Sequence, residues 1–250
     1  MKIGDIATDI FSGGTPNTQN PEYWGGALPW LSSGETRNRI IVKTEKTITP
    51  LGVSESSTRR ALKHDIVIAS AGQGTTRGRV SYSMIDTYIN QSVIAIRVDP
   101  HQVEPIWLFY NLYNRYEELR RLSDANASRG SITTKLIRDL EVKLPSLEEQ
   151  KTISPMLELI ERRIIGNNRM NETLESIGQR LFTSFFTDEK IVRVKSLAIE
   201  EQSDPEVAAI KELSGREPAE LQEQILTKVR QLVNRFPFEF EADGKPRGWR

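Results

Sequence analysis

A heptad-like repeat of apolar residues in the second half of the chain constrains the fold more than any other feature. Apolar residues recur there at alternating spacings of four and three, which is the pattern of a helix that packs along a narrow seam. A continuous helix over residues 147–186 would be ~60 Å long, far longer than a helix within a compact domain. The sequence therefore predicts a rod that packs on a second rod. The predicted seam consists of Ile153, Leu157, Ile160, Ile164, Asn167, Asn171, Leu174, Leu181 and Phe185.

Local signals bear on where this rod begins and how stable it is. Ser146 followed by Glu149 is a capping-box pattern and predicts a helix start at this point. Pro155 lies more than a turn inside the helix and is expected to kink it or to delay its start. Polar or small seam residues can fix register and partner at some cost in stability. The seam has three such positions, Asn167, Asn171 and Gly178.

The first 145 residues have the pattern of one sheet-rich domain. Strand-like segments at Asp65–Ser70, Arg79–Met84 and Val93–Val98 are separated by clusters of Gly, Pro, Ser and Asn. One helix is expected over Glu104–Leu122, with Pro105 in its first turn and an aromatic stripe that packs on the core. The predicted fold class is α+β, with a sheet-rich domain over residues 1–145 followed by a long coiled-coil-like spacer helix and a further helix.

Changes in pattern give the remaining boundaries. The spacer helix is expected over residues 146–187. A helical extension over residues 188–235 is expected to brace it and contains an amphipathic helix at Glu217–Val233. Residues 236–250 mix Pro, Gly and charged residues without periodicity, so they are expected to form a linker-like tail.

Composition excludes several classes of function. The chain has no cysteine and two histidines, which excludes thiolate zinc sites and multi-histidine metal sites. Its 34 basic and 34 acidic residues cancel, so any attraction for nucleic acid must come from local patches. No apolar run approaches the ~20 residues of a membrane span, and the N-terminus lacks the pattern of a secretory signal. We therefore expect a cytoplasmic protein with no metal site and no membrane contact.

The motifs that resemble catalytic or cofactor sites are incomplete. Asn20–Tyr23 differs by one residue from the Asn-Pro-Pro-Tyr motif of amino-group DNA methyltransferases, and a convincing glycine-rich turn for S-adenosylmethionine is missing. The glycines of residues 72–78 have the wrong spacing for a nucleotide loop, and a strand rather than a helix follows them. Neither His64 nor His101 lies in a recognisable nucleophile setting. We predict no catalytic residues in this chain.

Two loops of the first domain have the composition of a DNA-contacting surface. Ser70–Arg79 and Ala125–Arg138 together contain five basic residues and no acidic residue. Arg and Gln can pair with guanine and adenine edges, whereas hydroxyl side chains and Lys suit phosphate contacts. Ser131 is also a possible helix cap. The predicted DNA contacts are Gln73, Thr75, Thr76, Arg77, Arg79, Ser128, Arg129, Ser131, Thr133 and Lys135.

Five segments occur in an order that is more specific than any one of them. They are Lys2–Ile6 (KIGDI), Phe11–Pro16 (FSGGTP), Asn20–Trp30 (NPEYWGGALPW), Leu144–Gln150 (LPSLEEQ) and Arg169–Phe186. Together they resemble the specificity subunits of type I restriction-modification systems, in which a target-recognition domain runs into a long spacer helix. The chain departs from the family pattern at Ile3, where leucine is usual, and at Ser146, where a second proline is usual.

The resemblance implies a division of labour between subunits. In the family, two recognition domains lie at opposite ends of an antiparallel helical pair, and each reads one half of a split DNA target. Methyltransferase subunits and restriction subunits carry out the chemistry. The resemblance therefore implies a non-catalytic subunit that binds double-stranded DNA and docks both partners, with S-adenosylmethionine, ATP and magnesium bound on the partner subunits only.

The chain resembles one half of such a subunit, either a natural half-subunit or a fragment. Gly244–Trp249 (GKPRGW) is similar to the segment that introduces a second recognition domain in the family. Two-fold self-association along the seam would restore the missing half, so we expect a homodimer that reads an interrupted palindrome. The alternatives are a diverged DNA methyltransferase or nuclease domain, and a purely structural coiled-coil assembly protein.

Overall fold

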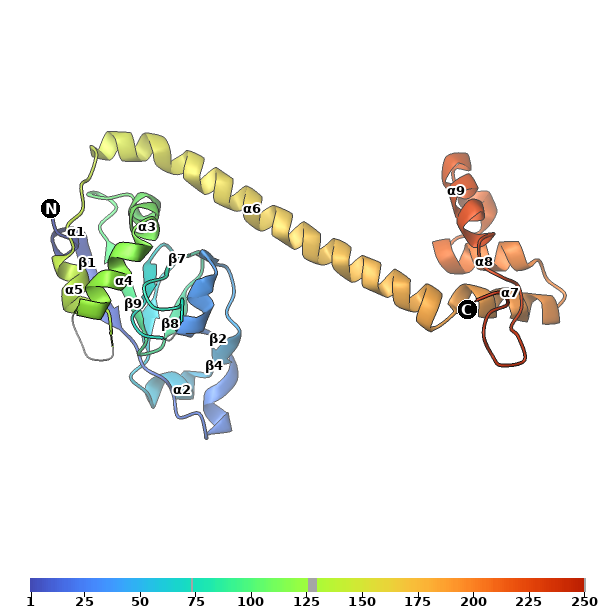
Figure 1. The fold of residues 1–250 in the computed structure, drawn as a ribbon, viewed down its shortest axis with the longest axis horizontal. Helices are drawn as coiled ribbons and strands as arrows, with labels where there is room; N and C mark the ends of the chain where they lie inside the picture. The colour runs from blue at the N-terminus through green and yellow to red at the C-terminus, as the bar shows by residue number, and fades with distance from the viewer. Residues whose placement is uncertain (73, 126–129, 250) are drawn as a thin grey trace. The chain divides into compact units, whose positions relative to one another are not determined.

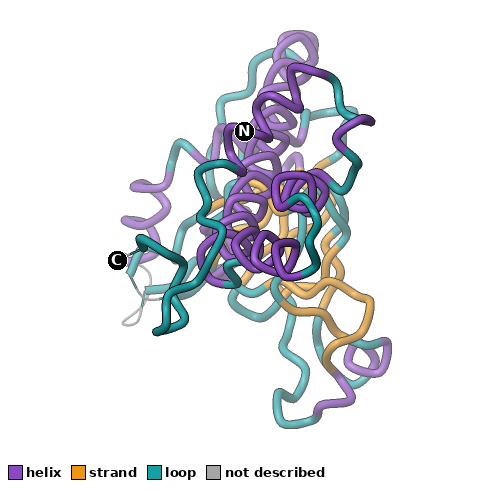
Figure 2. The backbone as a smooth tube through the Cα atoms, turned by 90° about the vertical axis from the view of Figure 1, so that its right-hand side faces the viewer, coloured by secondary structure: helices purple, strands orange, loops and turns teal. Residues whose placement is uncertain are grey.

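A computed structural model describes residues 1–72, 74–125 and 130–249 of the chain. The chain divides into two compact units, Met1–Ile164 and Ile165–Arg250. Figure 1 colours the first unit from blue to yellow and the second in orange and red, and Figure 2 distinguishes helices from strands. Mixed sheets precede a long helix and several short helices, which confirms the predicted α+β class.

A mixed five-stranded sheet forms the centre of the first unit. Its order is β1 (Ala7–Ser12), β9 (Val93–Val98), β6 (Ile66–Ala69), β7 (Val80–Ser83) and β3 (Ile40–Ile41). Neighbouring strands are antiparallel except for the edge pair β7 and β3, which is parallel. Ile66 and Ile68 face one buried core, whereas Val67 faces another. Because both faces are covered, the middle strand β6 is apolar at every position instead of alternating.

A second, four-stranded sheet covers one face of the first. Its order is β4 (Lys46–Ile48), β2 (Trp24–Leu31), β8 (Thr87–Ile89) and β5 (Arg59–Ala61). Leu31 and Ile89 of this sheet share a core with Val67 of β6. A short helix, α2 (Pro50–Ser54), begins at the side-chain cap of Thr49, which accepts from the Gly52 N–H.

Helices cover the other face of the five-stranded sheet. They are α1 (Ile3–Ile6), α3 (Pro105–Tyr113), α4 (Tyr116–Ala125) and α5 (Thr134–Asp139). The three predicted strands are present as β6, β7 and β9, whereas the helix predicted over Glu104–Leu122 is two helices, α3 and α4. The chain turns between them at Asn114 and Arg115. The Arg115 guanidinium holds this turn, because it donates to the Glu141 carbonyl at 2.8 Å and to the Glu118 carboxylate.

The long helix α6 (Leu147–Phe182) begins where the capping box predicts. The Ser146 N–H and hydroxyl both donate to the Glu149 carboxylate, at 2.8 and 2.7 Å, and the Glu149 N–H donates back to the Ser146 hydroxyl. These hydrogen bonds hold the pKa of Glu149 below its ordinary value. They satisfy backbone donors that the first helical turn leaves without partners.

Pro155 does not delay the start of α6, so that part of the expectation was wrong, whereas the expected kink stays a prediction. The helix runs from Leu147 to Phe182 with Pro155 inside it. Proline removes one backbone donor, the one that would bond the carbonyl four residues earlier. The residue with this carbonyl, Lys151, is exposed, as is Pro155, so water can hydrate the carbonyl.

Among the described residues, no helix is both long enough and apolar enough to cross a membrane.

The second unit contains the end of α6 and three short helices with their own core. The helices are α7 (Lys190–Glu200), α8 (Pro205–Ser214) and α9 (Glu223–Val233). Ile191, Ile210 and Val233 are buried together at their junction. The helix predicted over Glu217–Val233 is shorter than expected, since Pro218–Glu220 form a separate helical turn before α9 begins.

The last residues of the second unit pack on its core, unlike the expected linker-like tail. Phe236 is buried beside Val233, and Phe240 and Trp249 pack against the same cluster. A backbone bridge between Phe240 and Pro246 closes the segment into a loop. Aromatic residues decide this outcome, because each one buries a large apolar area whether or not it belongs to a periodic pattern.

Candidate nucleic-acid interface

Two predicted DNA-contacting loops, far apart in the sequence, are adjacent in the first unit. One joins β6 to β7, and the other precedes α5. The Ile132 N–H donates to the Ser70 carbonyl at 2.9 Å, and the Arg77 Nη1 donates to the Gly130 carbonyl at 2.7 Å. The described parts of both loops therefore form one surface. Three predicted contacts, Gln73, Ser128 and Arg129, lie outside the described residues.

Arg77 ties these two loops together. Besides the Gly130 carbonyl, its guanidinium bonds the Asp124 carboxylate, and its side chain is only 11% exposed. Gly130 has a φ of +56°, and a Cβ there would lie 1.9 Å from the Arg77 Nη1. A side chain at residue 130 would displace the guanidinium, and the positive φ there favours glycine. These internal contacts give Arg77 a structural role, and its contact with DNA stays a prediction.

The segment before α5 combines a helix cap with exposed polar residues. Thr133 caps α5, because its hydroxyl accepts from the Leu136 N–H at 3.1 Å. The cap considered at Ser131 was therefore placed two residues too early. Thr133 and Lys135 are exposed and Ser131 is half-buried, so all three are accessible to a ligand.

Helix α4 holds the glycine-rich loop between β6 and β7. The Thr75 carbonyl accepts from both the Arg79 Nε at 2.8 Å and the Tyr116 hydroxyl at 3.0 Å. The Arg120 Nη1 donates to the Gly74 carbonyl at 2.8 Å. Sequence reasoning missed Tyr116 and Arg120, because a helix predicted as a core element gave no reason to connect its polar residues with a distant loop. The one sequence feature that could have pointed to these two residues is that an aromatic residue and a basic residue lie four positions apart in the same helix.

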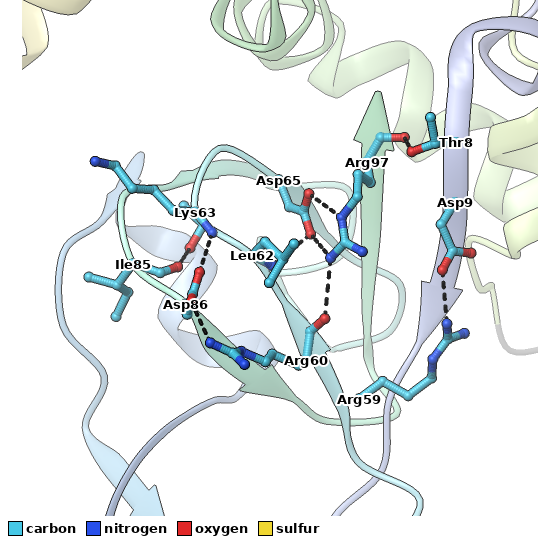
Figure 3. A network of polar contacts seen from close by, with 11 residues as sticks. Thr8, Asp9, Arg59, Arg60, Leu62, Lys63, Asp65, Ile85, Asp86 and Arg97 are labelled. Carbon is cyan, nitrogen blue, oxygen red and sulfur yellow. Dashed lines mark hydrogen bonds and ion pairs between the residues drawn. The ribbon is translucent and has the colours of Figure 1, made fainter. Parts of the chain in front are cut away.

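Several other basic residues of the first unit are paired with carboxylates. Figure 3 shows this network. Arg97 donates to Asp65 at 2.7 Å, Arg60 to Asp86 at 2.6 Å and Arg59 to Asp9 at 2.9 Å. Burial raises the pKa of Asp65, although the hydrogen bonds from Arg97 oppose this shift. Because an acidic partner compensates each guanidinium, this cluster attracts phosphates less than unpaired arginines do.

The described residues contain no cluster of three or more His, Cys, Asp and Glu side chains that could hold a metal ion. His64 is half-buried, and its Nδ1 bonds the Tyr82 hydroxyl. Burial lowers the pKa of His64. His101 is exposed in a turn.

The first half of α6 is anchored on the first unit through polar contacts. Gln150 is 1% exposed, and its Oε1 accepts from the Glu104 N–H at the start of α3 at 3.1 Å. Glu161 is 3% exposed and accepts from the Arg39 guanidinium at 3.1 Å and from the Tyr110 hydroxyl. Leu157, a predicted seam residue, packs between these anchors against the domain core. The two loops described above and this part of α6 thus belong to the same compact unit.

We predict that Glu161→Gln weakens this anchor. A neutral amide loses the ion pair with Arg39 and the charge-assisted bond from Tyr110, so the free energy of unfolding of the first unit should fall by about 1–3 kcal/mol. Burial and the Glu161 carboxylate raise the pKa of Tyr110 to about 12, and this pKa should fall in the variant. Urea denaturation and ultraviolet tyrosine titration measure the two effects. Glu158→Gln, on the same helix and more exposed, is the control, and equal effects of both substitutions would contradict the anchor.

An apolar stripe remains exposed along α6. Of the predicted seam, Ile153, Ile160, Ile164, Leu174 and Leu181 are exposed, as are the polar residues Asn167 and Asn171. Phe185 is half-buried in the second unit. Three more exposed apolar residues, Met156, Met170 and Ile177, each lie one position before a seam position and widen the stripe. Stripes of this kind on soluble proteins mark surfaces that bind another protein surface.

Comparisons with known proteins agree with this architecture. The chain is 27% identical over 210 residues to the MjaIX type I restriction enzyme specificity subunit of Methanocaldococcus jannaschii, covering 82% of this chain and 48% of that protein. It is 26% identical over 242 residues to the HindI specificity subunit of Haemophilus influenzae, covering 88% of this chain and 52% of that protein. The chain thus spans about half the length of the curated relatives it matches.

A solved structure shares the fold of this chain, and a family model matches most of its sequence. The fold is similar to that of a type I restriction-modification S subunit from M. genitalium, with a TM-score of 0.57 at 15% identity, over 74% of this chain and 45% of that one. The model of the type I restriction modification DNA specificity domain matches residues 1–176, which include the sheet-rich domain and most of α6. The chain therefore belongs to the type I restriction-modification DNA specificity domain family.

Proposed function

We propose that the chain is a sequence-specific DNA-binding specificity subunit that reads one half of a split target and carries no catalytic site of its own. The observation that carries this proposal is the family match over residues 1–176, which spans both the recognition loops and most of the helix that is anchored on the same unit. The loops supply donors for DNA from Thr75, Thr76, Arg79 and Lys135. Because these loops are fixed to a rigid sheet, their orientation relative to the first half of α6 is set before DNA binds.

The proposal assigns the chemistry to partner subunits. A methyltransferase subunit would bind S-adenosylmethionine, and a restriction subunit would bind ATP and magnesium. The chain at hand would dock these partners on the DNA at the sequence that it selects. The family relationship supports this division, since the relatives with curated names are specificity subunits.

The exposed stripe on α6 supports a second copy of this chain as its occupant. The stripe combines heptad spacing with polar residues at Asn167 and Asn171, and such positions select one register between two helices. A two-fold axis would place two identical recognition domains on one DNA duplex. The expected target is then an interrupted palindrome.

The test is reconstitution with the cognate methyltransferase subunit, followed by mapping of methylated sites on random DNA supplied with S-adenosylmethionine. Methylation at one split, symmetric sequence is the expected result. Methylation at an asymmetric split sequence would support DNA reading and contradict the homodimer. A dimer that forms no methylating complex and has no DNA affinity at low salt would favour a purely structural coiled-coil protein. Binding of S-adenosylmethionine by the chain alone would favour a diverged methyltransferase.

A further inference from the structure

A small basic cleft opens beside the glycine-rich loop of the first unit. Its volume is about 250 Å³. It lies where α3 meets α4, next to the first residue of β7. None of the described lining residues is acidic, and the lining consists of Thr36, Arg37, Arg79, Val80, Tyr113 and Tyr116. Tyr113 belongs to the aromatic stripe that was expected to pack on the core, but it is 40% exposed.

Arg79 is held in this cleft with one edge of its guanidinium open. Its Nε donates to the Thr75 carbonyl, and the guanidinium lies 6.0 Å from the centre of the Tyr116 ring. The Tyr116 hydroxyl bonds the same Thr75 carbonyl, so the loop, the arginine and the tyrosine form one unit. Within the described part of the chain, the two terminal amino groups of Arg79 have no hydrogen-bond partner. They form the fork that binds two oxygens of one anion.

The charge around the cleft is positive. Among residues 1–72, 74–125 and 130–249, no carboxylate pairs with Arg79 or with the neighbouring Arg120, whose side chain donates to backbone carbonyls. Arg37 pairs with Glu45 at 2.6 Å, but both side chains are exposed. Exposed pairs of this kind contribute little stability, so Arg37 can exchange Glu45 for another anion. This contrasts with the carboxylate-paired arginines in Figure 3.

We propose that this cleft binds a phosphodiester group of the DNA backbone, with Arg79 as the principal ligand and Arg37 as the second. The inference rests on the proposed function and assigns one contact within it. A concave, basic cleft suits a phosphate, because phosphates protrude from the duplex whereas base edges lie inside its grooves. Tyr116 acts as a positioning residue, since it holds the Thr75 carbonyl that orients Arg79. The contact fixes the placement of the recognition loops on DNA and reads no base.

The test compares Arg79→Gln with the unaltered full-length chain on random-sequence duplex DNA at several salt concentrations. Loss of a charge-assisted, two-point contact should weaken binding by about ten- to hundredfold. The slope of log affinity against log salt should become shallower by about 0.9, because one phosphate is no longer neutralised. When the methyltransferase complex is mapped, the methylated sequence should stay the same.

Three variants separate charge, geometry and positioning. Arg60→Gln removes the same charge from a carboxylate-paired arginine that does not line the cleft and should leave affinity and slope nearly unchanged. Arg79→Lys keeps the charge but loses the fork, so it should retain the slope and bind with intermediate affinity. Tyr116→Phe should weaken binding severalfold without changing the slope, because it removes a positioning hydroxyl and no charge.

Two results would overturn the inference. A changed base at one position of the methylated sequence in Arg79→Gln would make Arg79 a base-reading residue instead of a phosphate ligand. An unchanged slope in Arg79→Gln, with unfolding temperature equal to that of the unaltered chain, would mean that no phosphate binds there. Both results require that the unaltered chain binds DNA. Failure of the unaltered chain to bind would instead refute the proposed function.

Discussion

A chain carrying Leu174→Glu is expected to sediment as a monomer at concentrations where the unaltered chain is a dimer. Leu174 is 57% exposed in the C-terminal part of the stripe on α6, and two-fold symmetry introduces the substitution twice into one interface. Loss of each buried leucine weakens association by about 1.5–3 kcal/mol, or about 3–6 kcal/mol for both copies. The dissociation constant should therefore rise by about two to four orders of magnitude. Analytical ultracentrifugation measures it directly.

The matched control for this substitution is Gln179→Glu. Position 179 is exposed on the same helix, five residues after Leu174, so it lies on the side away from the stripe. It adds the same charge and should leave the dimer intact. In the reconstituted methyltransferase complex, only Leu174→Glu should lose methylation at a symmetric split site. A Leu174→Glu chain that remains dimeric, or an unaltered chain that is monomeric at tens of micromolar, would exclude the stripe as a dimer seam.

Lys195→Ala is expected to unfold the second unit. Lys195 is 0% exposed, and its Nζ donates to the carbonyls of Val233 and Phe236 at 2.7 and 2.8 Å, where α9 ends. The substitution removes the ammonium donor from both carbonyls, of which that of Val233 keeps the Phe236 N–H at 3.1 Å, and it opens a cavity where the side-chain stem was. The combined cost is about 3–5 kcal/mol, which is comparable to the whole stability of a small domain. Hydrogen exchange should show lost protection in α7 and α9 while the first unit stays protected.

Two further variants separate the contributions of Lys195. Lys195→Met keeps the apolar stem, so it should cost about 1–3 kcal/mol, mainly from the loss of the ammonium hydrogen bonds. Lys228→Ala, at an exposed position of α9, should change stability by less than about 0.5 kcal/mol. If the amide protons of α7 and α9 were equally protected from hydrogen exchange in Lys195→Ala and Lys228→Ala, the buried ammonium would have no structural role.

The buried ammonium also predicts a pH dependence of the second unit. Burial lowers the pKa of Lys195 from its ordinary value of 10.5, and Glu206 opposes this only partly. The folded state therefore releases the proton at a lower pH than the unfolded state. Between the two pKa values the unfolded state binds more protons, so stability should rise with pH in this window. Lys195→Met should lack this rise in denaturation experiments.

The candidate site divides into residues that sequence could identify and residues that it could not. Composition was enough to select the loop containing Thr75 and Arg79, because Gly, Thr and Arg clusters without acids are visible in one dimension. It gave Arg77 and Arg79 the same role, although the structure ties Arg77 to Asp124 and Gly130 and leaves one edge of Arg79 open. Tyr116 and Arg37 could not be assigned at all, since they reach the cleft from other elements.

By itself, the sequence determined the features that repeat or lie within one turn. The heptad spacing predicted α6, Ser146 and Glu149 predicted its first residue, and short apolar runs predicted β6, β7 and β9, because periodicity and capping act between residues close along the chain. Only the tertiary structure decided which side of α6 is anchored through Gln150 and Glu161. It also decided that residues 236–249 pack on a core. Those outcomes depend on contacts between residues distant in sequence, and local patterns do not specify which distant partner each side chain will meet.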